Sequence, residues 1–483
     1  MLEAMLLIDS DARPASDNCA FERVNPVSLA VSTRAAAASR EDAMIAANAA
    51  ARAFPEWSQT PPSDRRMRLN TAADLLLART EDFIEAVVSE TGGTASWARF
   101  NCELAAKILR EAAAMTTQIA GEVIAADQPG MLALAMRQPC GVVFSLAPWN
   151  APVVLAVRSI AMPLACGNTV VLKGSELCPR THGLVGEVLN EAGLPRGAVN
   201  VVHSAIEKTP EIVETLIAHP AVRRVTFTGS TRVGRMIAGI AARHLKRCLL
   251  ELGGKAPLLV LDDADIDAAV DAAVFGAFFH QGQICMSTER IIVDRAVADE
   301  FVERFAAKAS TIKATDPSDP DCRLGAMISE QAALRVSSLL SDAQSKGARL
   351  VIGGRQEGVF VDPTILDRVT SAMRIYREEC FGPVASVIRV DGEDEAVTVA
   401  NDTEYGLAAA IFSRDVSRAL EVAKRIESGI CHINSATVHD EPQMPFGGVK
   451  GSGYGRFGGK AGIDEFTELR WITIQGGRRN YPF

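Results

Sequence analysis

The stretch of sequence that decides the fold covers residues 141–173 and reads GVVFSLAPWNAPVVLAVRSIAMPLACGNTVVLK. A short β-branched run opens it, an apolar helix-like segment follows Pro152, and a second β-branched run closes it. A strand, a helix and a second strand at this interval predict a parallel α/β unit. The part from Gln138 to Val157 carries no charge, but its prolines make it a poor membrane helix.

The same alternation continues toward the C-terminus. Further predicted strands lie at 199–202, 222–227, 249–252 and 290–293, predicted helices near 266–279, 298–309 and 332–345, and more short strands up to about residue 433. The chain is 483 residues long, which is roughly three times a typical domain. We therefore predict an α/β protein with two doubly wound parallel-sheet (Rossmann-like) domains.

The two ends of the chain differ from this pattern. Residues 1–120 are rich in alanine at helical spacing and predict a helical layer. Within it, Ser39 and Asp42 resemble a capping box that opens a helix reaching about Phe54. Near the C-terminus, the alternation in Arg470–Ile474 predicts a strand that pairs with another part of the chain or with another subunit.

Composition excludes several classes of protein. Hydrophobic residues make up 48% of the chain and charged residues 23%, so we expect a globular protein. The net charge of −9 is opposite to the basic surface of a nucleic-acid-binding protein. The ten cysteines include no C-x-x-C pair, which favours reduced thiols in the cytoplasm. The N-terminus lacks the basic region of a signal peptide, and no histidine has metal-ligand spacing to another, so we predict no metal.

Polar residues follow several predicted strands, where open α/β sheets bind ligands. Asn150 comes just after the strand at 142–146, and its amide could stabilise an oxyanion, although a helix N-cap explains it equally well. Lys173 and Glu176 follow the next strand and could grip ribose hydroxyls, or form an ordinary solvated strand end.

The segment from Gly229 to Gly234 joins a strand to a helix start. Such a turn points backbone N–H groups at a phosphate. Arg235 and Met236 follow it instead of the Lys-Ser/Thr pair of a nucleotide triphosphatase, and the Rossmann G-x-G-x-x-G is absent. Any dinucleotide would then be held in a variant way, and a plain helix-start turn is an alternative interpretation.

Two reactive side chains lie farther along the chain. Glu251 ends an apolar strand before two glycines and is a candidate general base. Cys285 lies in a glycine-containing loop and is a candidate nucleophile, although a lone cysteine is more often a small core residue. The segments 378–384 and 445–453 are glycine-containing loops for which structural turns are the default interpretation. Neither G-x-S-x-G nor H-E-x-x-H occurs, so a serine hydrolase of that type and a zincin have no support.

Taken in this order, the segments resemble the aldehyde dehydrogenase superfamily from about residue 20 to the C-terminus. The matching motifs are P-W-N at 148–150, K-x-[SA]-E at 173–176, G-S-T-x-x-G at 229–234, E-L-G-G-K at 251–255, G-Q-x-C at 282–285 and E-E-x-F-G-P-V at 378–384. The resemblance implies an NAD-binding domain (1–119 and 141–252), a catalytic domain (253–445) and a bridging β element (120–140 and 462–483). It also implies a homodimer or homotetramer in which the C-terminal strand extends a neighbour's sheet.

The resemblance further implies the chemistry. Cys285 would attack the aldehyde carbon, Asn150 and the Cys285 backbone N–H would hold the oxyanion, and Glu251 would activate water to hydrolyse the thioester. Glu379 would bind the nicotinamide ribose, and Glu176 would favour NAD over NADP by repelling a 2′-phosphate. The full set of expected cofactor residues is Trp149, Lys173, Glu176, Gly229, Ser230, Gly234, Leu252, Glu379 and Phe381.

Within the superfamily the chain most resembles the aromatic aldehyde dehydrogenases, which act on vanillin, benzaldehyde and salicylaldehyde. The similar stretches are 283–290, 429–434 and 437–446. Many relatives carry phenylalanine after P-W-N, whereas Ala151 would leave room for a ring. The expected substrate residues are Trp97, Ala151, Arg158, Phe279, Ile284 and Phe446. Trp97 and Arg158 are candidate partners for a ring hydroxyl, although Arg158 could equally be an internal ion-pair partner.

Three alternatives remain open from the sequence. A CoA-acylating semialdehyde dehydrogenase would pass the thioester to a thiol, and retention of Glu251 argues against it. An enzyme for aliphatic aldehydes would share the same motifs. A catalytically silent binding protein would be expected to lose the nucleophile, and Cys285 is present. His280 stands where relatives more often have asparagine; it could tune the pocket or simply pack.

Overall fold

The larger of two parallel sheets is built around the segment quoted first. The structure is a computed structural model that describes all 483 residues. Eight strands form this sheet in the order β22-β12-β11-β8-β9-β10-β2-β3. Their bounds are β2 Leu6–Ile8, β3 Asp11–Arg13, β8 Val142–Leu146, β9 Thr169–Lys173, β10 Val199–Val202, β11 Val222–Thr228, β12 Arg247–Glu251 and β22 Gly453–Tyr454. The five central strands are parallel and the outer three antiparallel.

The strand order reverses beside β8. The chain runs outward from β8 through β9 to β10 and then returns to place β11 on the other side of β8. Such a reversal leaves the carboxyl ends of the two neighbouring strands uncovered by connections. Asn150 follows the end of β8 and Gly229 the end of β11, so both segments lie at the carboxyl ends of neighbouring parallel strands.

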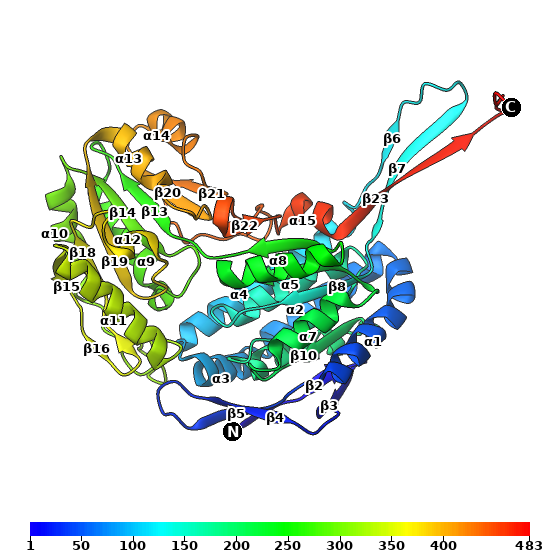
Figure 1. The fold of residues 1–483 in the computed structure, drawn as a ribbon, viewed down its shortest axis with the longest axis horizontal. Coiled ribbons are helices and arrows are strands. Elements are labelled where there is room, and N and C mark those ends of the chain that lie inside the picture. Colours follow the sequence, from blue (N-terminus) through cyan, green and yellow to red (C-terminus); the bar gives the residue numbers. More distant parts are fainter.

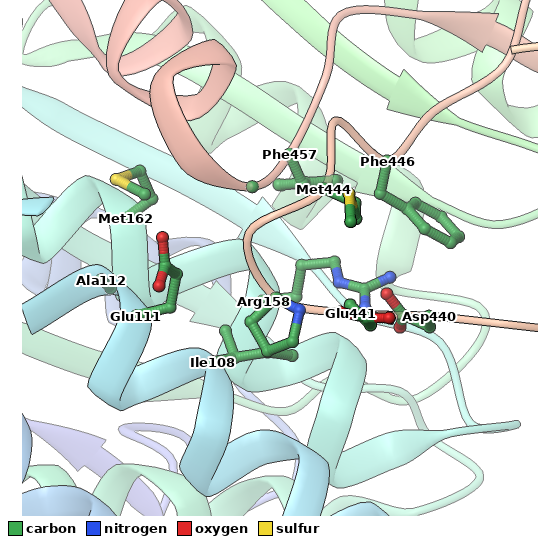
Figure 2. A pocket seen from close by; sticks show the side chains of 12 residues that line it. Ile108, Glu111, Ala112, Arg158, Met162, Asp440, Glu441, Met444, Phe446 and Phe457 are labelled. Carbon is green, nitrogen blue, oxygen red and sulfur yellow. Dashed lines mark hydrogen bonds and ion pairs between the residues drawn. The ribbon is translucent and has the colours of Figure 1, made fainter. Parts of the chain in front are cut away.

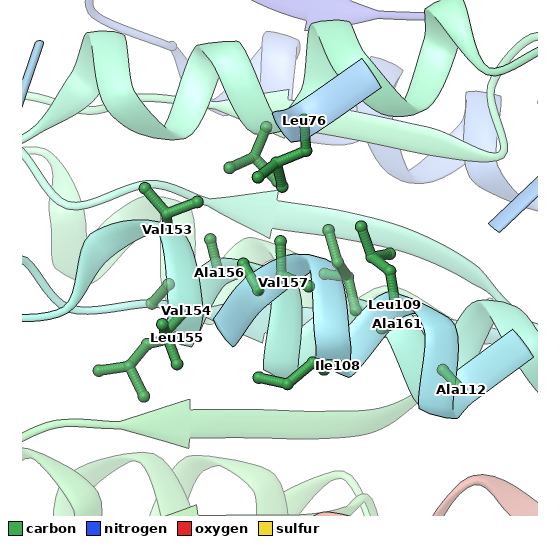
Figure 3. Packing of buried hydrophobic residues seen from close by; sticks show 14 of the residues in the cluster. Leu76, Ile108, Leu109, Ala112, Val153, Val154, Leu155, Ala156, Val157 and Ala161 are labelled. Atoms are coloured by element: carbon green, nitrogen blue, oxygen red, sulfur yellow. The ribbon is translucent and has the colours of Figure 1, made fainter. Parts of the chain in front are cut away.

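Helices cover both faces of this sheet. They are α1 Arg40–Gln59, α2 Pro62–Ala78, α3 Thr80–Thr91, α4 Ala95–Met115, α5 Pro152–Ala165, α6 Pro179–Glu191, α7 Thr209–Ala218 and α8 Thr231–Arg243. One apolar core packs α1, α7 and α8 against one face of the sheet. Another packs the five helices from α2 through α6 against the opposite face. Every residue of α5 is buried, and Figure 3 shows its apolar side chains packed against those of α4. No helix combines the length and apolar character needed to cross a membrane.

A second sheet of seven strands follows in the order β15-β18-β19-β14-β13-β20-β21. Its strands are β13 Ala256–Val260, β14 Thr288–Asp294, β15 Arg349–Ile352, β18 Thr364–Asp367, β19 Val384–Val390, β20 Ala408–Phe412 and β21 Ile430–Ile433. Its helices are α9 Ile266–Phe278, α10 Ala298–Ala309, α11 Glu330–Ser345, α12 Arg374–Arg377, α13 Gly392–Asn401 and α14 Val416–Ala423. All pairs except β15–β18 are parallel. The predicted α/β class with two doubly wound parallel sheets is confirmed.

A three-stranded arm projects from the body in Figure 1. It consists of β6 Glu122–Ile124, β7 Met131–Pro139 and, after α15 Gly459–Phe466, β23 Thr467–Gln475. The C-terminal strand predicted near 470–474 pairs antiparallel with β7 over its full length, from Thr467 opposite Pro139 to Gln475 opposite Met131. Its other edge has no partner in the chain. The assignment of residue ranges to three domains remains a prediction.

The N-terminal region differs from the expected helical layer. Residues 2–36 form short strands, and helices begin only at Arg40; besides β2 and β3 these strands are β1 Leu2–Ala4, β4 Ala20–Val24 and β5 Val31–Ala36. Strand pairing with distant segments such as β10 overrides the local helical preference of alanine. The Ser39–Asp42 capping box is present, but α1 continues past Phe54 to Gln59. The buried Trp57, whose Nε1 donates to the Leu164 carbonyl at 3.1 Å, anchors this last turn despite Pro55.

Candidate active site

Cys285, Asn150 and Glu251 come together although they are far apart in sequence. Cys285 follows the short 3-10 turn Phe279–Gly282 after α9. The Asn150 Nδ2 donates a 3.0 Å hydrogen bond to the carbonyl of Gln283, two residues before the thiol. Glu251 ends β12, and its carboxyl group neighbours the Cys285 thiol. The structure thus gathers a sulfur, a side-chain amide and a carboxyl group at one place.

Glycines allow the loop after β12 to approach the loop that carries Cys285. A Cβ added to Gly254 would lie 2.2 Å from the Cys285 carbonyl oxygen, which is far inside van der Waals contact. The loop at 445–453 closes over the same point, because the Ser452 Oγ donates to the Gly253 carbonyl at 2.6 Å. The Leu252 N–H in turn donates to the Ser452 carbonyl at 3.1 Å. These contacts hold Glu251 beside Cys285.

Burial changes the proton affinities at this centre. It raises the pKa of Glu251 to about 7, while the neighbouring Cys285 thiol and the charge of Arg158 act in the opposite direction. Neither carboxylate oxygen of Glu251 has a hydrogen-bond partner. Burial also raises the pKa of Cys285 well above its ordinary value, and the Glu251 charge adds to this shift. The thiol therefore needs a base, and Glu251 is the carboxyl group in contact with it.

The six expected substrate residues all line one cavity of about 260 Å³, which Cys285 and Asn150 also line. Those six are Trp97, Ala151, Arg158, Phe279, Ile284 and Phe446. Aromatic rings form much of the wall: Trp97 and Phe279 meet edge to face with centroids 5.1 Å apart. Such a wall suits a flat ring held by stacking and edge contacts.

Two of the expected substrate residues have partners of their own. The Trp97 Nε1 donates to the Asn150 carbonyl at 3.0 Å, so the only donor of this indole is not free to reach a ring hydroxyl. The Arg158 guanidinium forms an ion pair with Asp440 and lies over the Phe446 ring, 4.3 Å from its centroid. Of the two interpretations left open for Arg158, the structure contains the internal ion pair.

Several cavity residues were not identified from the sequence: Phe100, Leu104, Val154, Leu155, Phe275, Met286, Val438, His439 and Asp440. Helical spacing could have indicated two of them, since Phe100 is one turn from Trp97 and Phe275 one turn before Phe279. Asp440 is separated from its partner by 282 residues, and no local pattern could have linked the two. His280 packs rather than lining the cavity, because it is buried and stacks on Trp97 with ring centroids 4.3 Å apart.

The expected cofactor residues lie along the ends of the first sheet. At the end of β9, the Lys173 Nζ lies 3.2 Å from the Glu176 Oε2. Ser230 caps α8 through the Val233 N–H, and a Cβ on Gly234 would meet Leu252 at 2.5 Å. The close approach at Gly234 brings the start of α8 against the loop that carries Glu251.

Of the remaining cofactor candidates, Glu379 and Phe381 lie on the turn before β19, and Trp149 follows β8. The Glu379 Oε1 accepts a 2.8 Å hydrogen bond from the Gly254 N–H, and burial raises the pKa of Glu379 to about 7. Phe381 meets Trp149 edge to face at 5.8 Å. Buried Glu289 accepts the N–H groups of Cys380 and Phe381 and forms a buried ion pair with Lys255.

This donor set fits a dinucleotide. A carboxylate beside a lysine suits ribose hydroxyls, and the free N–H groups at the start of α8 suit a diphosphate. Glu379 lies on the turn that leads into the second sheet, and it contacts the loop that follows Glu251. The expected residues therefore form a track along the strand ends toward Cys285. No group of three His, Cys, Asp or Glu side chains is placed to hold a metal ion.

Comparison with known proteins gives three findings. The model of the aldehyde dehydrogenase family matches residues 13–472. The chain is 61% identical over 482 residues to the vanillin dehydrogenase of Pseudomonas fluorescens and 52% identical over 483 residues to the salicylaldehyde dehydrogenase of Pseudomonas putida, with 100% of each chain covered in both cases. The crystal structure of a salicylaldehyde dehydrogenase from Pseudomonas putida G7 complexed with salicylaldehyde matches with a TM-score of 0.98 at 51% identity and 100% coverage of both chains.

Proposed function

The chain belongs to the aldehyde dehydrogenase family, and on this premise we propose that it oxidises aromatic aldehydes of the vanillin, benzaldehyde or salicylaldehyde type to carboxylic acids with NAD. It is an oxidoreductase that acts on aldehydes, and its family uses a nicotinamide cofactor. The observation that carries the substrate proposal is the cavity, which Cys285 lines and where 13 of the 17 lining residues are hydrophobic. The names and high identity of the relatives support the same substrate class.

The first step follows from the contacts around Cys285. The sulfur bonds to the aldehyde carbon, and the thiol proton passes to the neighbouring Glu251. The Asn150 amide has two N–H groups and gives only one to the Gln283 carbonyl, so the second is available for the oxyanion together with the Cys285 backbone N–H. These donors stabilise the thiohemiacetal oxyanion that the addition creates.

Completion of the reaction needs an acceptor and a base. NAD, when bound, would supply hydride acceptance. The thiohemiacetal oxyanion would then reform a C=O bond as the C–H bond breaks and the hydride leaves, which would give a thioester on Cys285. Once Glu251 has released its proton to solvent, it takes a proton from water, and the resulting hydroxide displaces Cys285 from the thioester. The presence of this base favours hydrolysis over transfer of the acyl group to CoA.

NAD rather than NADP is the proposed cofactor. Glu176 lies beside Lys173 at the end of β9 and is only partly buried. A carboxylate there can accept from the ribose hydroxyls but repels a 2′-phosphate. Exchange of Glu176 for glutamine should therefore lower the NAD to NADP ratio of kcat/KM.

Assembly and location are proposed on the same basis. The outer edge of β23 has no partner, and Leu469, Trp471 and Ile474 are exposed on it. We infer that this arm mediates a homodimer or homotetramer and that residues 1–119 with 141–252, 253–445, and 120–140 with 462–483 act as the NAD-binding, catalytic and bridging units. All ten cysteines are unpaired, which supports a cytoplasmic protein.

Turnover with matched substrates tests the proposed function. Purified protein is incubated with NAD and vanillin, benzaldehyde, salicylaldehyde or butanal, and NADH absorbance is followed with and without CoA. We expect the aromatic aldehydes to have the higher kcat/KM without CoA, and Cys285→Ala to bind NAD but to oxidise nothing. A requirement for CoA, or a preference for butanal, would replace the proposal with one of the alternatives.

A further inference from the structure

Arg158 is the only charged residue of α5, a helix that is otherwise apolar and entirely buried. Its side chain is only 7% exposed. A guanidinium cannot lose its proton in a protein, and burying it without a partner is costly. Its neutralising partner therefore decides the charge of the cavity that it lines.

That partner is Asp440, which lies on the loop after β21 and is 11% exposed. Both side chains line the cavity that Cys285 also lines. Figure 2 shows the Asp440 carboxylate facing the Arg158 guanidinium, with Phe446 close by. The two opposite charges cancel at the wall of the substrate cavity.

The arginine has little room to leave this position. The Phe446 ring covers it at 4.3 Å, and the hollow behind it, lined by Ile108 and Met162, has a volume of only about 20 Å³. The neighbouring acidic residue Glu441 is engaged elsewhere, because its Oε1 lies 3.0 Å from the His439 Nε2. Glu111 lines the same hollow, and Glu251 is close enough for the Arg158 charge to lower its pKa. Asp440 is nevertheless the only carboxylate that forms an ion pair with Arg158.

We propose that Asp440 sets the charge preference of the substrate cavity: by pairing with Arg158 it leaves the wall without net charge, so neutral aromatic aldehydes are accepted and carboxylated ones are rejected. This inference rests on the proposed function. A benzaldehyde that carries a carboxylate would have to bury that charge without a free cation. If Asp440 were neutral, the same guanidinium would be a ready partner for such a substrate.

Two benzaldehydes of nearly the same shape separate charge from size. 4-Carboxybenzaldehyde carries the charge, and its methyl ester, methyl 4-formylbenzoate, is neutral. For the wild-type protein we expect kcat/KM to favour the ester strongly. Asp440→Asn should raise the acid-to-ester ratio by about tenfold or more, because a charge-assisted hydrogen bond becomes available.

Variants of Arg158 test whether its guanidinium causes the change in the acid-to-ester ratio. Arg158→Met together with Asp440→Asn removes both charges and should return the ratio to that of the wild type. Arg158→Met alone leaves the carboxylate unpaired and should shift selectivity the other way, toward 4-(trimethylammonio)benzaldehyde. This opposite shift keeps the proposal testable even if Asp440→Asn does not fold. Glu441→Gln makes the same charge change on the same loop and should leave the ratio unchanged.

A second measurement tests how the Arg158–Asp440 pair affects the pKa of Glu251. The charged or titratable groups that act on Glu251 are Cys285, Arg158 and Asp440, and Asp440 raises the Glu251 pKa. Asp440→Asn should therefore move the acidic limb of the kcat profile to lower pH. An unchanged acid-to-ester ratio in folded Asp440→Asn, or an equal rise in the double variant, would overturn the inference. Failure of the wild type to oxidise any neutral aromatic aldehyde would instead overturn the proposed function.

Discussion

The indole N–H of Trp97 donates a 3.0 Å hydrogen bond to the backbone carbonyl of Asn150. Trp97 is itself held between neighbours, since His280 stacks on it at 4.3 Å and Phe100 at 5.6 Å. The bond holds the backbone of Asn150, the residue whose side-chain amide we propose as the oxyanion donor. A ring of the cavity wall would thereby also position the proposed catalytic amide.

Trp97→Phe keeps a ring in the wall but removes the donor. We expect kcat to fall about fivefold to tenfold, the size of one net hydrogen bond, for benzaldehyde and butanal alike. Phe275→Leu alters the same cavity wall at a ring that stacks on Phe279 rather than on Trp97, and it should change mainly KM for benzaldehyde. A Trp97→Phe effect confined to KM would show that the bond does not position Asn150.

The raised pKa of Glu251, about 7, predicts a pH dependence of turnover. The protonated carboxyl group cannot accept a proton from water, so kcat should fall as the pH drops through about 7. Glu251→Gln removes both the acceptor of the thiol proton and the base for hydrolysis, so we expect both the NADH burst and the steady-state rate to fall sharply. Rapid-mixing absorbance measurements check this, and an unchanged steady-state rate would remove Glu251 from the role of base.

The same group predicts a pH-dependent stability. Its pKa in the folded protein lies above the ordinary value of 4.5, so its contribution favours folding at low pH and is lost as the pH rises through about 7. Glu251→Gln should be more stable than the wild type by roughly 3 kcal/mol near pH 8 and about equal near pH 4. Urea unfolding at both pH values measures the difference, and equal gains at both would contradict it.

The buried Lys255–Glu289 ion pair predicts that the effects of substituting its two residues on stability are strongly non-additive. Glu289→Gln leaves an unpaired cation in the core and should cost about 3 kcal/mol or more of the free energy of unfolding. It should also raise KM for NAD, because Glu289 holds the turn that carries Glu379. Adding Lys255→Met should restore most of the stability. Glu300→Gln, in an exposed pair, should change it by less than about 0.5 kcal/mol.

Replacement by alanine should change stability in opposite directions at two glycines. At Gly254 the added Cβ would lie 2.2 Å from the Cys285 carbonyl oxygen, whereas Gly239 on α8 has open space around it. Gly254→Ala should destabilise by about 1–3 kcal/mol and sharply lower kcat, whereas Gly239→Ala should stabilise by about 0.5–1 kcal/mol. Thermal unfolding and turnover check both, and full activity of Gly254→Ala would show that the loops can separate.

The exposed edge of β23 predicts that substitutions on this strand weaken the oligomer. Leu469 is 61% and Trp471 77% exposed on this strand, and replacing both with lysine should place charges on the proposed contact. We expect a lower mass in sedimentation than for the wild type. Leu245→Lys, at a residue 94% exposed elsewhere, should not change the mass. An unchanged mass for the double variant would place the contact on another surface.

Much of the architecture could be predicted locally. Short apolar strands and helix-start signals carry their own hydrophobic pattern, so β8, β9 and the capping box at Ser39 were recognisable from the sequence. The strands before residue 37 were not, because their pairing partners are distant in the chain. Proline at 55 signals a helix end, and only the burial of Trp57 explains why α1 continues.

By itself, the sequence determined the two α/β units and the motif order that marks Cys285, Asn150 and Glu251 as candidates, since strand period, glycine turns and reactive residue types are local properties. Only the tertiary structure decided that Asp440 pairs with Arg158 and that the Trp97 donor is directed at Asn150. Which buried charge or donor finds which partner depends on contacts between residues far apart in the chain. Those contacts exist only once the helices and loops have packed around the cavity.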